Sequence, residues 1–291
     1  MLTCALMGGL GNQLFQIFAT IAYAINTKQK FGFSNVDFLV TGVQRRTYWN
    51  DFLVKLKPFT FASVNAPRQL IVVNEKEFRY NPVDLLSHKG FNVCLQGYFQ
   101  SYKYFNTHFD IICRLICIDQ LKNKVLEKTS CIASDNNIVS MHFRLGDYKH
   151  LQAFHPIMPF NYYKNALTKI AEMQQQQQQQ PFPRVVLYFC EEEDLHDVQC
   201  TVHALQHVFP EWRFEHASST ELSDWEQMIL MSCCRYNIIA NSTFSWWAAQ
   251  LNAHDDKIVC YPAQWFGPSA NNDTTDLFPE SWERIFATDP L

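Results

Sequence analysis

The sequence predicts an α/β protein built around parallel sheets. Short apolar runs, which are typical of buried strands, alternate along the chain with segments of helical periodicity. Polar and charged residues recur just after these runs, and the carboxyl ends of parallel strands would bring them together at one edge of a sheet. At 291 residues, the chain has the length at which a single core commonly divides into two domains.

Composition excludes several classes of protein. Apolar residues make up 47% and charged residues 18% of the chain, which is a globular composition. The net charge is −4 and the 24 Lys and Arg residues are dispersed, so we expect no nucleic-acid partner. The ten cysteines form no Cys-x-x-Cys pair, which argues against a zinc ribbon or a thioredoxin motif and favours free thiols.

No segment has the character of a membrane span or a leader. The longest apolar stretch covers residues 14–25 and is interrupted by Gln16 and Thr20, whereas a span needs roughly 20 apolar residues. The apolar run that begins at Leu2 has no targeting segment before it. We therefore expect no membrane span and a cytoplasmic location.

The expected elements fall into two series. Strands are predicted at residues 2–7, 137–141, 184–189, 236–240 and 258–261, and helices at residues 12–28 and 162–173. The polar stretch 128–137 precedes the second series, which predicts domains at residues 1–136 and 137–291. Seven glutamines at residues 174–180 predict a solvated loop or helix extension without a function of its own.

The first motif is Gly8-Gly9-Leu10-Gly11-Asn12-Gln13, between the first strand and its helix. Such a turn lets the backbone approach a phosphate or a sugar, with helix N–H groups directed at it. A dinucleotide fingerprint would need a further glycine where Leu14 stands, and no Gly-Lys-Ser/Thr follows for a P-loop. By itself the motif fits a structural turn as well as a binding loop.

The second motif is His142-Phe143-Arg144-Leu145-Gly146-Asp147-Tyr148, at the end of an expected strand. An arginine there can grip a diphosphate with both prongs of its planar guanidinium. The alternative is a structural ion pair between Arg144 and Asp147.

The third motif is Asn241-Ser242-Thr243-Phe244-Ser245-Trp246-Trp247, where a strand gives way to a helix. Small hydroxylated residues at a helix start can present O–H and N–H donors to an anion. One Ser or Thr is an ordinary N-cap, but the whole run exceeds what capping requires.

Taken in order, these motifs resemble the α1,2-fucosyltransferase family. Gly97-Tyr98-Phe99-Gln100-Ser101, Lys103-Tyr104-Phe105, Pro159 and Tyr162-Tyr163 add to the likeness, which runs from residue 5 to about residue 282. The chain departs from the family at Leu145, where many relatives carry a second arginine, at Cys190-Glu191-Glu192, in place of Ser-Asp-Asp, and at Ala248. None of these changes removes a group that the chemistry plainly requires.

The resemblance implies a GT-B-type fold, with two Rossmann-like domains facing each other across a cleft. Residues 1–136 would form the acceptor side and residues 137–291 the GDP-fucose side. It implies an enzyme like a galactoside 2-alpha-L-fucosyltransferase, which moves L-fucose from GDP-fucose to a galactose-terminated glycan with inversion, without a metal or other cofactor. The alternatives are a transferase for another GDP-sugar and a non-catalytic carbohydrate- or sugar-nucleotide-binding relative.

The resemblance also implies roles for individual residues. Arg144, His142 and Asp147 are the expected catalytic residues. The expected donor-binding residues are Gly11, Asn12, Arg144, Asp224, Asn241, Ser242, Thr243, Phe244 and Ser245. Two choices stay open: Asp224 or Glu226 as the acid that reads the guanine, and His142, Asp147 or Glu191 as the general base.

Overall fold

The computed structural model describes residues 1–40, 43–129, 137–176, 185–217 and 222–288. The chain divides into two compact units. Unit 1 comprises Met1–Leu121 and Asn272–Pro279, and unit 2 comprises Lys122–Asn271 and Glu280–Leu291. The segment at residues 272–279, which the sequence assigned to the second domain, therefore belongs to the first compact unit, because its contacts lie there.

Unit 1 is built on a three-stranded parallel sheet. Strands β1 (Leu2–Cys4), β7 (Asn92–Gln96) and β6 (Leu70–Asn74) lie in the order β1-β7-β6. Helix α1 (Leu10–Thr27) follows β1 and packs on it through a buried apolar face, which explains the helical spacing in the sequence. The parallel pairing brings the ends of β1, β6 and β7 to the same edge of the sheet.

The remaining elements of unit 1 are short. The strands are β2 (Phe33–Ser34), β3 (Phe38–Leu39), β4 (Arg45–Arg46) and β5 (Thr60–Phe61). The helices are η1 (Val54–Phe59), η2 (Ser63–Asn65), η3 (Leu86–His88), η4 (Tyr102–Tyr104), η5 (Asn106–His108) and α2 (Phe109–Leu115). Helix α3 (Ile118–Lys128) runs from unit 1 into unit 2.

Unit 2 contains a six-stranded sheet in which every pairing is parallel, in the order β10-β9-β8-β11-β12-β13. The strands are β8 (Ile138–His142), β9 (Val185–Phe189), β10 (Arg213–His216), β11 (Tyr236–Ile238), β12 (Val259–Pro262) and β13 (Glu283–Ile285). From β8 the chain first adds strands outward to β10, and then returns to place β11 on the other side of β8. This is the Rossmann order, and the reversal between β8 and β11 is its topological switch point.

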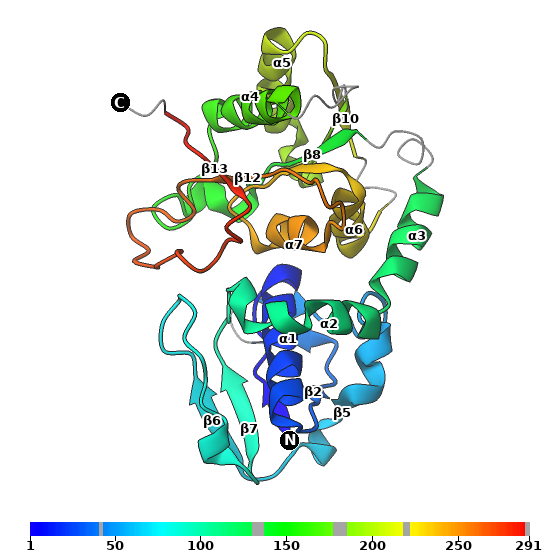
Figure 1. Cartoon of the computed structure of the whole chain (residues 1–291), viewed down its shortest axis with the longest axis vertical. Coiled ribbons are helices and arrows are strands. Elements are labelled where there is room, and N and C mark those ends of the chain that lie inside the picture. Colours follow the sequence, from blue (N-terminus) through cyan, green and yellow to red (C-terminus); the bar gives the residue numbers. More distant parts are fainter. Residues whose placement is uncertain (41–42, 130–136, 177–184, 218–221, 289–291) are drawn as a thin grey trace. The chain divides into compact units, whose positions relative to one another are not determined.

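Helices cover both faces of this sheet. Helices α4 (Phe160–Gln176) and α5 (Leu195–Val208) lie on one face, and α6 (Asp224–Cys233) and α7 (Thr243–Leu251) lie on the other (Figure 1). The 3-10 helices η6 (Gly146–His150) and η7 (Glu192–Asp194) follow β8 and β9. Because both faces are covered, β8 and β9 are buried along their whole length. The sequence of β9 is a continuous apolar run, and β8 carries two buried polar residues, Ser140 and His142.

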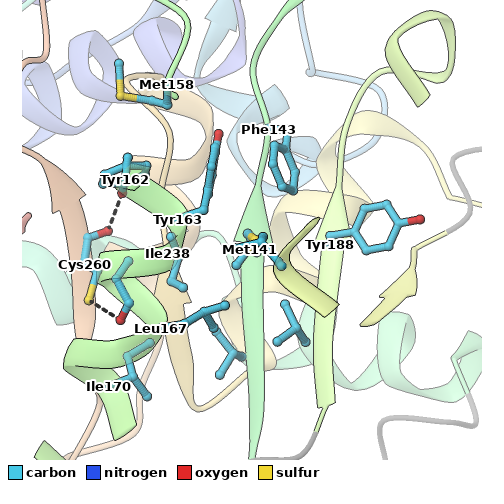
Figure 2. Close-up of a cluster of buried hydrophobic side chains, with 14 of the residues drawn as sticks. Met141, Phe143, Met158, Tyr162, Tyr163, Leu167, Ile170, Tyr188, Ile238 and Cys260 are labelled. Atoms are coloured by element: carbon cyan, nitrogen blue, oxygen red, sulfur yellow. Dashed lines mark hydrogen bonds between the residues drawn. The ribbon is translucent and has the colours of Figure 1, made fainter. Parts of the chain in front are cut away.

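The core between the sheet and α4 also anchors the switch point. Met141, Tyr188 and Leu167 belong to one buried cluster (Figure 2). The hydroxyl of Tyr162 donates hydrogen bonds to the carbonyl oxygens of Ile239, at 2.5 Å, and Cys260, at 3.2 Å. This side chain therefore ties α4 to the ends of β11 and β12.

The structure confirms the α/β fold class, with two units that each contain a parallel sheet. The predicted boundary at residue 136 stays a prediction, because residues 130–136 lie outside the described part of the chain. For the glutamine run, the helix extension is the alternative that the structure shows at residues 174–176, because α4 continues to Gln176. One expectation is corrected: Gln174 is buried in that helix and not solvated. Residues 177–180 of the glutamine run fall outside the described residues.

Candidate functional site

The switch point of unit 2 brings two of the sequence motifs together. His142 ends β8, and the Asn241–Ser245 segment follows β11, which pairs with β8. The rings of His142 and Phe244 lie 5.6 Å apart between centroids. The hydroxyl of Tyr148 donates a hydrogen bond to the carbonyl oxygen of Asn241, at 3.1 Å. Open α/β sheets bind their ligands at this position.

Arg144 is the charged centre of this site. Its Nη1 donates to Oε1 of Glu191 and its Nη2 donates to Oδ1 of Asp147, while the guanidinium lies 5.1 Å from the ring centre of Tyr148. The Arg144 side chain is 20% exposed. Burial alone would lower the pKa of Arg144, but the carboxylates of Glu191 and Asp147 raise it overall, so the side chain stays cationic.

The carboxylates of this ion-pair cluster are more accessible than the arginine. The side chain of Asp147 is 49% exposed and that of Glu191 is 52% exposed. The structural pair between Arg144 and Asp147 that the sequence left open is present, but it is not a buried pair. Exposed pairs contribute at most about 1 kcal/mol to stability, so a purely structural role is a weak account of Arg144.

His142 is a neutral imidazole in this setting. Its side chain is buried, and burial together with the nearby charge of Arg144 lowers its pKa to about 3. Its Nδ1 atom is buried without a hydrogen-bond partner among the described residues. The hydroxyl of Tyr163 donates to the His142 carbonyl oxygen at 3.3 Å, which fixes the end of β8. His142 can therefore offer a hydrogen bond to a ligand but not a positive charge.

The five residues of the Asn241–Ser245 segment have different surroundings. Asn241 is buried, and its Nδ2 donates to the carbonyl oxygens of Pro156, at 2.8 Å, and Trp265, at 3.2 Å. Ser245 is buried and donates to the carbonyl oxygen of Ser242. These two residues hold the loop in place.

The other three residues of the segment lie closer to the surface. Ser242 is the N-cap of α7 and accepts a hydrogen bond from the backbone N–H of Phe244. Ser242, Thr243 and Phe244 are partly exposed. They are accessible for direct contact with a ligand.

Asp224 and Glu226 separate clearly in the structure. Glu226 is buried and completes the capping box of α6, accepting hydrogen bonds from the backbone N–H and the hydroxyl of Ser223, at 2.9 and 2.7 Å. It also pairs with Lys128. Asp224 lies exposed in the first turn of α6. Of the two acids, Asp224 is the one whose side chain is accessible to a guanine base.

The glycine motif forms a loop at the edge of the unit 1 sheet. Gly8 has a φ of 80°, and a Cβ there would lie 2.4 Å from Nδ2 of Asn12, so the position requires glycine. Nε2 of Gln100 donates to Oδ1 of Asn12 at 2.9 Å. Nε2 of Gln16 donates to the Met7 carbonyl oxygen, and its Oε1 accepts from the Met7 N–H. Gly11 is buried in the first turn of α1.

Glu75 is a candidate functional residue of unit 1 that the sequence motifs do not include. It follows β6, and its Oε2 accepts a hydrogen bond from the backbone N–H of Tyr98 at 2.8 Å. Burial raises its pKa, although backbone hydrogen bonds from Phe99 and Tyr98 oppose the shift. Gly97 allows this packing, since a Cβ there would lie 2.3 Å from the Cβ of Glu75. No local sequence pattern marks this residue, because the contact depends on the pairing of β6 with β7.

The described residues show neither a cluster of metal ligands nor a membrane-spanning helix. They contain no group of three or more His, Cys, Asp or Glu side chains arranged to hold a metal ion. Within the same residues, no helix combines the length and the apolar character that crossing a bilayer demands.

The buried imidazole predicts a pH dependence of stability. The pKa of His142 is about 3 in the folded chain and about 6.5 in the unfolded chain, so only the unfolded chain gains this proton between those values. The free energy of unfolding should therefore fall by about 1.4 kcal/mol for each pH unit below about 6.5. Between about pH 7 and pH 5, the free energy of unfolding measured in urea should fall by roughly 2 kcal/mol less in His142→Gln than in the wild type.

Exposed His150→Gln is the matched control for that measurement. An unchanged pH dependence in His142→Gln would show that the ring is not held neutral.

Comparison with known proteins gives the same assignment as the motifs. The model of glycosyl transferase family 11 matches residues 3–285. The O-antigen biosynthesis glycosyltransferase WbnK of Escherichia coli is 30% identical, over 95% of this chain and 98% of its own. An alpha-1,2-colitosyltransferase of Escherichia coli is 26% identical, over 96% and 97%. Among solved structures, POFUT1 in complex with GDP superposes with a TM-score of 0.49 and 9% identity, over 98% of this chain and 97% of its own. The resemblance found in the sequence is confirmed, and the chain belongs to glycosyl transferase family 11, the family of the α1,2-fucosyltransferases.

Proposed function

We propose that this glycosyltransferase moves L-fucose from GDP-fucose to a hydroxyl of a galactose-terminated glycan, forming an α1,2 linkage with inversion. The observation that carries the proposal is the placement of Arg144 just past β8 at the switch point, between His142, whose ring lies near Phe244, and Tyr148, which donates to Asn241. Family membership and the α-1,2 linkage named for the colitosyltransferase relative support the reaction class. That relative also makes GDP-colitose the donor to compare with GDP-fucose.

Departure of GDP is the step that the site is suited to assist. Breaking the bond between C1 of the sugar and the phosphate oxygen leaves negative charge on the nucleotide. Arg144 supplies a permanent positive charge and planar N–H donors, whereas His142 supplies at most a neutral hydrogen bond. The partly exposed Ser242, Thr243 and Phe244 lie at the start of α7, where backbone N–H groups can face an anion. Asp224 would read the guanine edge.

The three candidates for the general base each face a physical obstacle. His142 is a weak base because its pKa is about 3. Asp147 and Glu191 both accept hydrogen bonds from the Arg144 guanidinium, so one oxygen of each carboxylate is already engaged. The two carboxylates therefore fit a role in holding the arginine better than a role in accepting the acceptor proton.

Donor identity can be tested by thermal unfolding. A ligand that binds only the folded chain stabilises it by about 2.7 kcal/mol at a hundredfold excess over Kd. GDP and GDP-fucose should therefore raise the melting temperature, while UDP-sugars and NAD should leave it unchanged. A larger shift with a UDP-sugar would contradict the donor assignment, and turnover of GDP-colitose but not GDP-fucose would replace fucose with colitose.

We also propose that the reaction needs no metal. Other nucleotide-sugar enzymes neutralise the diphosphate with a metal cation held by an Asp-x-Asp motif, and the guanidinium of Arg144 can supply that positive charge instead. No Asp-x-Asp motif follows any of the predicted strands. EDTA should therefore leave the initial rate within about twofold, since arginine alone would offset the leaving-group charge. Activity that disappears in EDTA and returns with magnesium or manganese would refute this.

Arg144 itself gives the most direct test of the mechanism. Arg144→Ala should reduce turnover by about two to three orders of magnitude, as the loss of other donors to a developing anion does. Arg144→Lys should restore little, because a point charge cannot reproduce a planar two-pronged contact. The melting temperature of Arg144→Ala should stay close to that of the wild type, since its carboxylate partners are half-exposed.

The control for that experiment is Arg235→Ala. Arg235 forms an ion pair with Asp256 but follows α6, away from the strand ends that make up the site. Near-normal transfer by a well-folded Arg144→Ala protein would remove Arg144 from the mechanism.

A further inference from the structure

Both prongs of the Arg144 guanidinium are occupied by carboxylates of the chain itself. Nη1 donates to Glu191 and Nη2 donates to Asp147, while the ring of Tyr148 lies against the guanidinium. These two terminal nitrogens form the fork that matches the oxygens of a phosphate. A diphosphate that approaches this fork therefore competes with the two carboxylates for the guanidinium.

We propose that Glu191 is the residue displaced, and that its competition with the diphosphate sets the affinity for the donor. The inference rests on the proposed function, because it assigns the diphosphate of GDP-fucose to Arg144. In this account, Glu191 tunes the donor affinity by holding Arg144 until a phosphate takes its place. Asp147 keeps one N–H of Nη2, and the second N–H of Nη2 together with the released Nη1 can contact the diphosphate.

Asp147 is held beside Arg144 more firmly than Glu191 is, which explains why Glu191 is the carboxylate that a phosphate displaces. Asp147 lies three residues from Arg144 in the same turn, on a short side chain. That turn is held at Gly146, whose N–H donates to Oδ2 of Asp194 at 2.6 Å, and at Tyr148, whose hydroxyl donates to Asn241. Glu191 approaches from the N-cap of η7, just past β9, on a longer, half-exposed side chain. It can turn into solvent without moving any backbone.

Gly146 provides the place where the Glu191 carboxylate packs. A Cβ at Gly146 would lie 2.8 Å from Oε2 of Glu191, closer than packing allows. The glycine has a φ of 40°, in the left-handed region that favours glycine. The turn after β8 is thus shaped to receive the carboxylate beside Arg144.

The balance of charge gives the expected direction of the effect. One cation, Arg144, faces two anions, so a diphosphate approaching the intact cluster meets a net negative group. Glu192 and Glu193, which follow Glu191 directly, add further negative charge from exposed side chains, whereas Asp194 is neutralised by Lys149 at 2.8 Å. Replacing Glu191 with glutamine removes both the competing ion pair and one repulsive charge. Binding of a diphosphate should therefore become tighter.

Calorimetric titration with GDP and with inorganic pyrophosphate tests the inference. Glu191→Gln should bind GDP about three- to fivefold more tightly than the wild type, since the upper end for exposed ion pairs corresponds to a factor of about five. Glu193→Gln is the matched control: it removes the same charge two residues away, from an exposed side chain. Its affinity should stay within about twofold of the wild type.

A double substitution shows whether the gain acts through Arg144. In an Arg144→Ala background, Glu191→Gln should give a clearly smaller gain, because the competition no longer exists and only the removed repulsion remains. Glu191→Ala should repeat the gain, and melting curves confirm that each variant is folded.

Three results would overturn the inference. If folded Glu191→Gln binds GDP equally or more weakly, Glu191 only positions Arg144 and does not compete with the diphosphate. If Glu193→Gln shows the same gain in affinity, the gain comes from the lower net charge and not from the release of Arg144. In both cases the proposed function stands, because the wild type binds GDP. A wild type that binds neither GDP nor pyrophosphate would refute the proposed function together with this inference.

Discussion

The parallel pairing of β8 with β11 is the constraint on which the site depends. Tyr236 pairs with Val139 and Ile238 with Met141, so two segments about a hundred residues apart end side by side. The chain leaves β8 toward β9 and leaves β11 toward β12, which opens the sheet edge between them. A shift of one residue in this register would turn His142 to the opposite face of the sheet.

The electrostatics of the site follow from the same packing. Strand β8 is buried along its length, so its last residue, His142, ends in an environment that disfavours a charged ring. Arg144, two residues further on, extends beyond the strand and finds carboxylates that keep it cationic. One short segment therefore places a neutral imidazole and a permanent cation next to each other. Burial decides the state of the first, and ion pairing decides the state of the second.

Much of this could be predicted from the sequence because it depends on local patterns. The apolar runs of β8, β9, β11 and β12 marked the strands, and the motifs at residues 142–148 and 241–247 marked their ends. The helical periodicity of α1 and the glycine loop before it were equally legible. These features need no knowledge of which segments pair.

Other features could not be predicted because they depend on pairing or on side-chain competition. Glu191 reaches Arg144 only because β9 lies beside β8, and Glu75 reaches Tyr98 only because β6 lies beside β7. Gln174 looked like part of a solvated polar run, yet it is buried because α4 extends to Gln176. The hydrogen bonds of Glu226 with Ser223 are predictable from the sequence, since Ser223-Asp224-Trp225-Glu226 is a capping-box pattern. This capping role competes with a functional role for the acid.

Both units obey one physical rule about where polar chemistry can sit. A parallel strand covered on both faces is mostly apolar, and a polar residue inside it, such as Ser140 of β8, is hydrogen-bonded within the core. The carboxyl end of the strand is where polar side chains can meet a ligand. In unit 2 this position holds His142, and in unit 1 Gln100, which follows β7, donates to Asn12 in the first turn of α1. Parallel pairing then aligns those ends along a single edge, so polar groups from distant parts of the chain converge without any long-range sequence signal. The convergence is thus a consequence of burying the strands, and the particular side chains at the edge determine which ligand the edge can bind.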